Sequence, residues 1–229
     1  KSFPVTPIWQ TKPVVQDQII GKLIIDVILE AISENKGSIL VFLPGEGEII
    51  KLASSLTNKV PDNCHVFPLY GRLNFKDQQK AIKPTLNGRK IVLATNVAET
   101  SLTIEGIETV IDSGLSKRSI YDPNSGMARL VTQKISKSEA NQRMGRAGRL
   151  HPGICYKLWS KAQDGSFSDF PPSEIENSDL TPFALELALW GSNINELALL
   201  TRPKKKALAE AYKVLEMLGA VNEQLQITK

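Results

Sequence analysis

Short strand-like runs of apolar residues recur along the chain, and segments with a helical pattern separate them. The runs lie at residues 38–44, 64–69, 90–95, 109–113 and 153–159. The first, SILVFLP, is continuously apolar and leads into a Pro-Gly turn, which is typical of a strand buried on both faces. Helical patterns occupy residues 17–35, 46–56 and 75–82 and resume at about Ser138. Because strands that alternate with helices form βαβ units, we expect an α/β fold with a mostly parallel sheet and flanking helices.

A change of composition predicts a second, smaller module in the carboxyl-terminal part of the chain. Residues 117–133 read as a hairpin around the turn sequence PNSG, and polar, turn-rich sequence follows Trp159. We therefore expect a first domain over residues 1–160, a linker over 161–180 and a second domain over 181–229.

The second domain carries the pattern of a small, mainly α module. Helices are predicted at residues 181–190 and 204–218, and Gly219 ends the second of them. Residues 223–229 alternate like a strand. Helices followed by a short strand indicate a winged-helix module, cut at or near its wing.

Composition and charge exclude several classes of protein. The chain has 229 residues, and its two cysteines, Cys64 and Cys155, are too few for a disulfide scaffold. Its two histidines and two cysteines lack the spacing of a zinc site, so no metal site is expected. No apolar run could span a bilayer and no signal-peptide pattern follows Lys1, so we expect a cytoplasmic piece of a longer protein without a membrane partner. A net charge of +4 and a pI near 9.0 permit a nucleic-acid partner.

The stretch QRMGRAGR, residues 142–149, concentrates fixed positive charge beside two glycines. Ser136 and Glu139 have the spacing of a capping box, which predicts the start of a helix. If that helix continues, Gln142, Arg146 and Arg149 lie on one face at i, i+4 and i+7. Two guanidinium groups and an amide suit a polyphosphate, although a solvated basic helix is the alternative. Glycine in a helix costs about 1 kcal/mol relative to alanine, so Gly145 and Gly148 predict the close approach of a ligand or another backbone.

No phosphate-binding loop accompanies these arginines in the sequence. A nucleotide cradle needs G-x-x-x-x-G-K-[ST] at the start of a helix, and the Gly-Lys pair at residues 21–22 lacks that context. The Pro-Gly turn at 44–45 precedes Glu46 and Glu48, whose carboxylates would repel a phosphate from the helix that starts there. The arginines are therefore expected to reach a nucleotide that another domain holds. This argument excludes a nucleotide-binding domain complete in itself.

Residues 91–114 contain a second group of candidate site residues. Thr95 and Asn96 follow a predicted strand, at the edge of the sheet where α/β proteins place ligands. Ser101, Thr103 and Glu105 alternate after them, so they face the same side if this stretch is extended. Short hydroxyl and amide side chains can bind phosphate or ribose, but taken alone such a cluster is equally common in ordinary loops.

Four of these segments together resemble a known family. LVFLPGEGEI, PLYGRL, VLATNVAETSLTIEGIETVIDSG and QRMGRAGR look like motifs IV, IVa, V and VI of the DEAH-box RNA helicases, in the right order. Residues 113–149, together with LELALWG and VLEMLGAV, resemble the bacterial HrpB-type branch in particular. The resemblance covers almost the whole chain. It implies a second RecA-like domain and the start of a winged-helix domain, without the first RecA-like domain that carries the P-loop and the DEAH box.

The family resemblance also implies roles for individual residues. Gln142 would position the attacking water and Arg146 and Arg149 would be arginine fingers, with Gly145 beside the nucleotide. Thr103 and Glu105 would contact the nucleotide, and Ser101 would sense its state. Single-stranded RNA would lie against the residues of two loops, Gly71, Arg72, Thr95 and Asn96; DNA is not excluded.

The cofactor implied is ATP with Mg²⁺, whose ligands are expected on the missing domain. Ile82 occupies the position where eukaryotic relatives stack an aromatic ring on the adenine, which leaves the nucleotide selectivity open. The isolated fragment is expected to be inactive. The competing hypothesis is a non-catalytic module that binds RNA or protein through an α/β platform and a winged helix.

Overall fold

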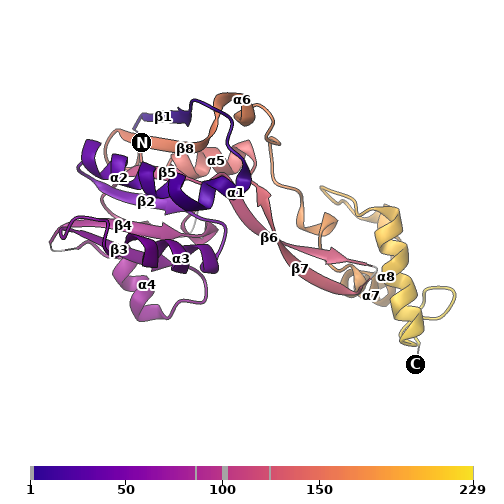
Figure 1. Cartoon of the computed structure of the whole chain (residues 1–229). Coiled ribbons are helices and arrows are strands. Elements are labelled where there is room, and N and C mark those ends of the chain that lie inside the picture. The colour runs from indigo at the N-terminus through magenta and orange to yellow at the C-terminus, as the bar shows by residue number, and fades with distance from the viewer. Residues whose placement is uncertain (1–2, 86, 100–102, 124, 229) are drawn as a thin grey trace. The chain divides into compact units, whose positions relative to one another are not determined.

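The computed structural model describes residues 3–85, 87–99, 103–123 and 125–228 (Figure 1). By its internal contacts the chain divides into two units. The first comprises residues 1–117 and 132–171, and the second comprises residues 118–131 and 172–229.

The first unit is built on a sheet of six strands in the order β1-β8-β5-β2-β4-β3, and every neighbouring pair is parallel. The strands are β1 (Val5–Gln10), β2 (Ser38–Phe42), β3 (Cys64–Leu69), β4 (Arg89–Ala94), β5 (Ile107–Asp112) and β8 (Gly153–Ser160). The α/β fold with a parallel sheet is therefore confirmed. β1 was not expected from the sequence, because Pro7 interrupts its pattern, and it is an edge strand, where proline is tolerated.

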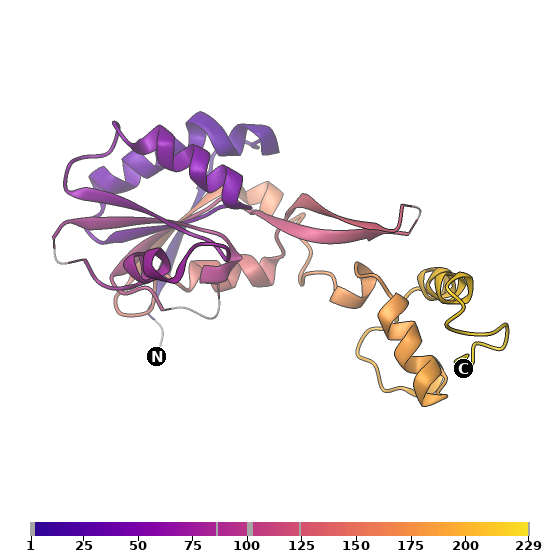
Figure 2. The same ribbon diagram turned by 90° about the horizontal axis from the view of Figure 1, so that it is seen from below.

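Helices cover both faces of this sheet (Figure 2). They are α1 (Gln16–Gln18), η1 (Ile19–Leu23), α2 (Ile24–Glu34), α3 (Glu46–Leu56), α4 (Phe75–Ile82), η2 (Asn96–Ala98), α5 (Lys137–Met144) and α6 (Lys161–Asp164). Alternate residues of β2 show why both faces need cover: Ile39 and Val41 pack with α2 and α3, whereas Leu40 and Phe42 pack on the face of α4 and α5. Both sets are buried, as the continuous apolar runs predict.

The helix expected over residues 17–35 is interrupted. The backbone leaves helical geometry at Ile20 and Gly21, and the regular helix α2 begins only at Ile24. The apolar spacing nevertheless selected the right side chains, because Ile24, Val27 and Ile28 are all buried against the sheet.

The second unit has a core of its own between two helices, α7 (Thr181–Trp190) and α8 (Lys205–Met217). Leu180, Ala184, Ala211, Leu215 and Val221 form that core. Both helices were predicted from the sequence. Over residues 223–228, the described part of the strand expected at 223–229, no strand is formed: an isolated antiparallel bridge joins Val221 and Ile227. Two short turns of helix, η3 (Glu174–Glu176) and η4 (Ile194–Glu196), complete this part of the chain.

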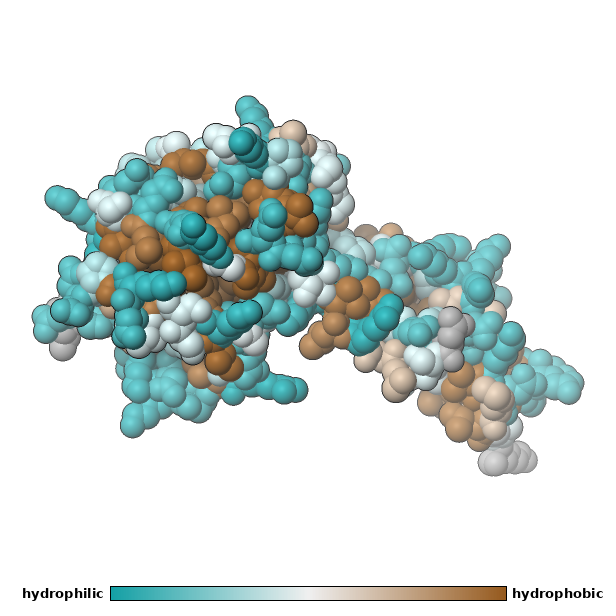
Figure 3. Space-filling view, in the orientation of Figure 1, coloured by the Kyte–Doolittle hydropathy of each residue, from teal (hydrophilic) through white to brown (hydrophobic). Residues whose placement is uncertain are grey.

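The predicted hairpin is present as β6 (Leu115–Asp122) and β7 (Met127–Lys134), which form a separate two-stranded sheet. Its outer part, residues 118–131, belongs to the second unit, whereas residues 161–171 belong to the first. Phe167 explains why residues 161–171 belong to the first unit, because its ring stacks on that of Trp159 at a centroid distance of 5.2 Å. Apolar side chains remain exposed in the second unit, among them Leu189, Met217 and Leu218. In each unit, Figure 3 shows brown apolar patches between teal polar areas.

Candidate functional site

Helix α5 carries the first half of the arginine-rich stretch. It begins with the predicted capping box, in which the Ser136 backbone N–H donates to the Glu139 carboxylate at 2.7 Å. The Ser136 hydroxyl in turn accepts a hydrogen bond from the Glu139 backbone N–H at 3.3 Å. The helix ends at Met144 with Gly145 as its cap, and residues 145–150 form turns.

The prediction that Gln142, Arg146 and Arg149 share one helix face is therefore wrong. Gln142 lies exposed in the last turn of α5, while both arginines lie in the turns that follow the helix. Gly145, the first glycine of QRMGRAGR, caps the end of the helix instead of continuing it. The chain then turns back toward β8, so the three side chains are positioned by a helix end and a loop.

Gly148, the second glycine of this stretch, allows another backbone segment to approach closely. The Phe3 backbone N–H donates to the Gly148 carbonyl at 2.8 Å, which ties the amino-terminal segment to the arginine loop. A Cβ atom at Gly148 would lie 2.5 Å from the Phe3 carbonyl oxygen. The expected close approach of another backbone is thus found, and only glycine fits there.

Arg143 is fully buried and joins three segments of the first unit. Its Nε donates to Glu99 Oε1 at 2.6 Å, and its Nη1 donates to Asp112 Oδ1 at 2.9 Å and to the Leu115 carbonyl at 3.1 Å. The guanidinium also lies 4.9 Å from the centroid of the Phe42 ring. Burial by itself would lower the pKa of Arg143, but Asp112 and Glu99 outweigh it and raise that pKa. The side chain is therefore a permanent cation inside the fold.

The two carboxylates that Arg143 holds come from different parts of the chain. Glu99 follows η2, in the loop after β4, and Asp112 ends β5. Burial raises the pKa of Glu99, and the charge of Arg143 offsets that only in part. Sequence reasoning missed this cluster. The one signal for it was an aspartate, Asp112, at the end of the apolar strand sequence TVID.

Arg149 and Arg146 lie close to the residues that follow β4. The Arg149 side chain is exposed, and its Nη1 donates to Thr103 Oγ1 at 2.6 Å. Arg146 is 6% exposed; burial lowers its pKa, and the nearby charge of Arg149 lowers it further while Glu99 raises it. Two guanidinium groups that repel each other and lie beside a hydroxyl form a suitable subsite for an anion.

Thr95 and Asn96 lie at the carboxyl end of the sheet. Thr95 follows β4, where its backbone N–H donates to the Leu69 carbonyl of β3 at 3.2 Å. Asn96 is exposed at the start of η2. Parallel strands bring their carboxyl ends to one edge, so the loop after β3 lies beside these two residues.

That neighbouring loop holds Gly71 and Arg72, and both residues are exposed. The Leu73 backbone N–H donates to the Tyr70 carbonyl at 3.0 Å and closes the loop into a turn. The structure thus brings the four residues expected to touch RNA to the same edge of the sheet.

The remaining candidate residues lie in other parts of the first unit. Ser101 lies outside the described residues. Glu105 is exposed just before β5, and its charge raises the pKa of the buried Lys90, which burial lowers more strongly. Ile82 is half-buried at the end of α4, and Gly145 is exposed at the end of α5.

The described residues form neither a metal-binding cluster nor a helix that could span a membrane. Among them, no group of three or more His, Cys, Asp or Glu side chains is placed to hold a metal ion. Over the same residues, no helix is long and apolar enough to cross a membrane.

A parallel six-stranded sheet with polar loops at its carboxyl edge and an arginine loop before β8 defines a class, the α/β domains of helicase motors. The model of the family "Helicase conserved C-terminal domain" matches residues 21–151. The chain belongs to this family. Its relatives place it with the DEAH-box type, so the resemblance stated from the motifs is confirmed.

Individual relatives agree with this assignment. The ATP-dependent RNA helicase HrpB of Escherichia coli (strain K12) is 43% identical over 194 residues, which cover 84% of the chain and 24% of that protein. The ATP-dependent RNA helicase DEAH12, chloroplastic, of Arabidopsis thaliana is 36% identical over 98% of the chain and 13% of its own length. The crystal structure of the E. coli DExH-box NTPase HrpB aligns with a TM-score of 0.89 and 37% identity, over 100% of the chain and 28% of that structure. The chain spans about a quarter or less of these relatives.

Proposed function

We propose that this chain is the second RecA-like domain, with the start of a winged-helix domain, of an ATP-dependent DEAH-box RNA helicase. The observation that carries the proposal is the pairing of Arg149 with Thr103, beside the buried Arg146. Arginines that gather around a hydroxyl suit a nucleotide phosphate, because guanidinium groups donate planar, bidentate hydrogen bonds to its oxygens. The family of the chain and the names of its relatives support the same function.

The nucleotide site is only half formed by these residues. The sequence contains no G-x-x-x-x-G-K-[ST] loop, and the first turn of α3 carries Glu46 and Glu48, with Glu48 paired to Lys117 at 2.8 Å. We therefore propose that a first RecA-like domain, joined to this chain in the whole protein, binds ATP and supplies the ligands of Mg²⁺. Arg149 and Gln142 fit the facing half, since Gln142 is exposed in the last turn of α5 and Arg149 is exposed in the loop that follows the helix.

Each of the chain's own residues then has a defined task. Arg149 would exchange its bond to Thr103 for charge-assisted hydrogen bonds to the terminal phosphate, and Arg146 would add a second positive charge. Gln142 would orient the water molecule that attacks. Bound ATP supplies the reacting phosphoryl group, and the chain supplies electrostatic stabilisation where negative charge develops.

The RNA contact belongs to the same rigid sheet. Asn96 and Arg72 are exposed on neighbouring loops and can donate hydrogen bonds to RNA phosphates, while Thr95 and Gly71 shape the backbone around them. Glu99 lies three residues after Asn96 and bonds to Arg143, next to Gln142. A movement of the arginine loop toward ATP would therefore carry the RNA contacts with it.

An Asn96→Ala substitution tests the RNA contact. We expect the affinity of the chain for a single-stranded RNA to fall about tenfold, because a hydrogen bond to a charged phosphate is lost. Fluorescence anisotropy with a labelled oligouridylate measures this. Asn58→Ala is the matched control, since Asn58 is exposed in a turn after α3, on the other face of the sheet. Equal affinities of the two variants would remove Asn96 from the RNA path.

A further inference from the structure

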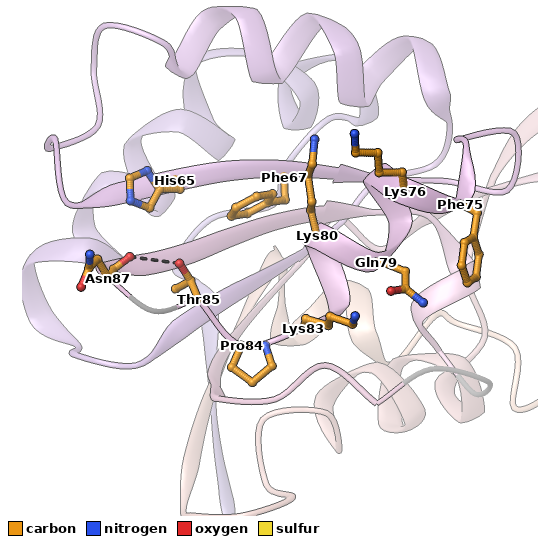
Figure 4. A pocket seen from close by; sticks show the side chains of 10 residues that line it. All are labelled: His65, Phe67, Phe75, Lys76, Gln79, Lys80, Lys83, Pro84, Thr85 and Asn87. Atoms are coloured by element: carbon orange, nitrogen blue, oxygen red, sulfur yellow. Dashed lines mark hydrogen bonds between the residues drawn. The ribbon is translucent and has the colours of Figure 1, made fainter.

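A cavity of about 820 Å³ lies between α4 and the outer strand of the sheet, β3 (Figure 4). His65 and Phe67 lie on β3 and line it from one side, and residues of α4 and of the segment after it line the other. The four residues expected to hold RNA do not line this cavity.

The charged side chains around this cavity all have one sign. Its ionisable lining residues are Lys76, Lys80, Lys83 and His65. Lys80 is paired to Asp77 at 2.8 Å, but Lys76 and Lys83 have no ion pair within the described part of the chain, and both are exposed. The three lysines follow one another at i, i+4 and i+7 along α4 and its cap, so they form a stripe. A stripe of this kind fits a row of phosphates.

Two aromatic rings lie beside the lysine stripe. Phe75 is 75% exposed at the first position of α4, and Phe67 is half-buried on the β3 side. The Lys90 ammonium lies 5.9 Å from the Phe67 ring centroid, within the range of a cation–π contact. Exposed aromatic rings among cationic side chains are the usual platform for unpaired bases.

The cavity continues from the proposed RNA path. Phe75 follows Arg72 by three residues, so the cavity opens where the loop after β3 ends. A peptide could instead add a strand to the open edge of β3, but Pro68 lacks an N–H in the middle of that edge. The observations therefore favour a nucleic acid over an acidic peptide.

We propose that this cavity binds a second stretch of single-stranded RNA, with phosphates on Lys76 and Lys83 and bases against Phe75 and Phe67. The proposal rests on the proposed RNA-binding function and extends its path from the carboxyl edge of the sheet along α4. An RNA strand that leaves the first site would turn onto the outer side of α4.

Two lengths of labelled oligouridylate separate the two sites: about 6 nucleotides for the first site alone, and about 15 for both. In the 229-residue chain, K76Q/K83Q leaves the Lys80–Asp77 pair intact and should leave the affinity for the short strand unchanged. For the long strand, the slope of log K against log salt should fall by about 1.4, which corresponds to two lost phosphate contacts. Phe75→Ala should weaken only the long strand, by about 5- to 150-fold. K51Q/K59Q removes the same amount of charge near α3, and it should change the affinity for neither the short strand nor the long strand.

The outcomes distinguish this inference from the proposed function. If K76Q/K83Q and K51Q/K59Q affect the long strand equally, the cavity does not bind RNA, and an effect of Asn96→Ala on both strands would still support the first site. If Asn96→Ala has no effect but K76Q/K83Q does, the first site fails and the cavity stands alone. A labelled glutamate-rich peptide with a central phenylalanine is the competing probe. Peptide binding that K76Q/K83Q abolishes, with RNA binding unchanged, would overturn the inference.

Discussion

Replacing Arg143 by alanine is expected to destabilise the first unit by about 3–5 kcal/mol. The substitution leaves Asp112, which is fully buried, and Glu99, which is largely buried, without the cation that both now contact. Removing one partner of a buried ion pair costs more than the pair itself contributes, because the remaining charge stays desolvated. The measurement is urea unfolding followed by tryptophan fluorescence in a Trp190→Phe background, so that Trp9 and Trp159 report only the first unit.

Lys137→Ala is the matched control for this experiment. Lys137 begins the same helix and pairs with Asp169 at 2.8 Å, but the two side chains are 41% and 73% exposed. Ion pairs at the surface contribute about 0.2–1 kcal/mol, so this variant should unfold at nearly the wild-type urea concentration. A loss at Arg143 no greater than that at Lys137 would mean that the buried cluster is not a stabilising centre of the fold.

Replacing Arg149 by alanine is expected to lower RNA-stimulated ATP hydrolysis in the whole helicase by about 10³- to 10⁵-fold. The Arg149 guanidinium is exposed and donates a hydrogen bond to the neutral hydroxyl of Thr103, so it is available to stabilise charge on the transferred phosphoryl group. Arg149→Lys should recover a small part of the rate, because an ammonium keeps the charge and loses the planar, bidentate geometry. Turnover of ATP under saturating RNA measures both variants.

Nucleotide binding must be measured in the same proteins, because the cradle belongs to the other domain. We expect the affinity for a non-hydrolysable ATP analogue to change far less than the rate. Arg202→Ala is the control, since Arg202 is an exposed arginine of the second unit that donates to Asn195 at 3.1 Å. Turnover that survives in Arg149→Ala would assign this arginine to RNA binding or structure.

The sheet and its helices could be predicted from the sequence because burial dictates the pattern. The strand at Ser38–Phe42 is apolar at nearly every position since both of its faces are covered, and helix α3 was predicted with its observed bounds, Glu46–Leu56. β1 was missed because Pro7 and polar neighbours conceal a strand that pairs on one side only. The prediction of a strand at residues 223–229 was wrong, because an alternating pattern does not by itself provide a partner strand.

The sequence predicted the residue types of the candidate site better than it predicted their arrangement in space. The one-face prediction for Gln142 and the two arginines assumed a helix through Gly145, where the helix in fact ends. The contact of Gly148 with Phe3 and the ion pairs of Arg143 join residues far apart in sequence, so no local pattern could reveal them. What the sequence did identify was a concentration of arginine without a phosphate loop, and the proposed function still depends on that.

The most direct test of the split nucleotide site is ATP hydrolysis by the 229-residue chain on its own, with and without single-stranded RNA, beside its Arg149→Ala variant. The account predicts the same background rate for both proteins, because this chain lacks the loop that cradles the phosphates. Turnover by the wild-type chain that disappears in Arg149→Ala would show a complete active site within these residues. That result would contradict the claim that the arginines serve ATP held by another domain.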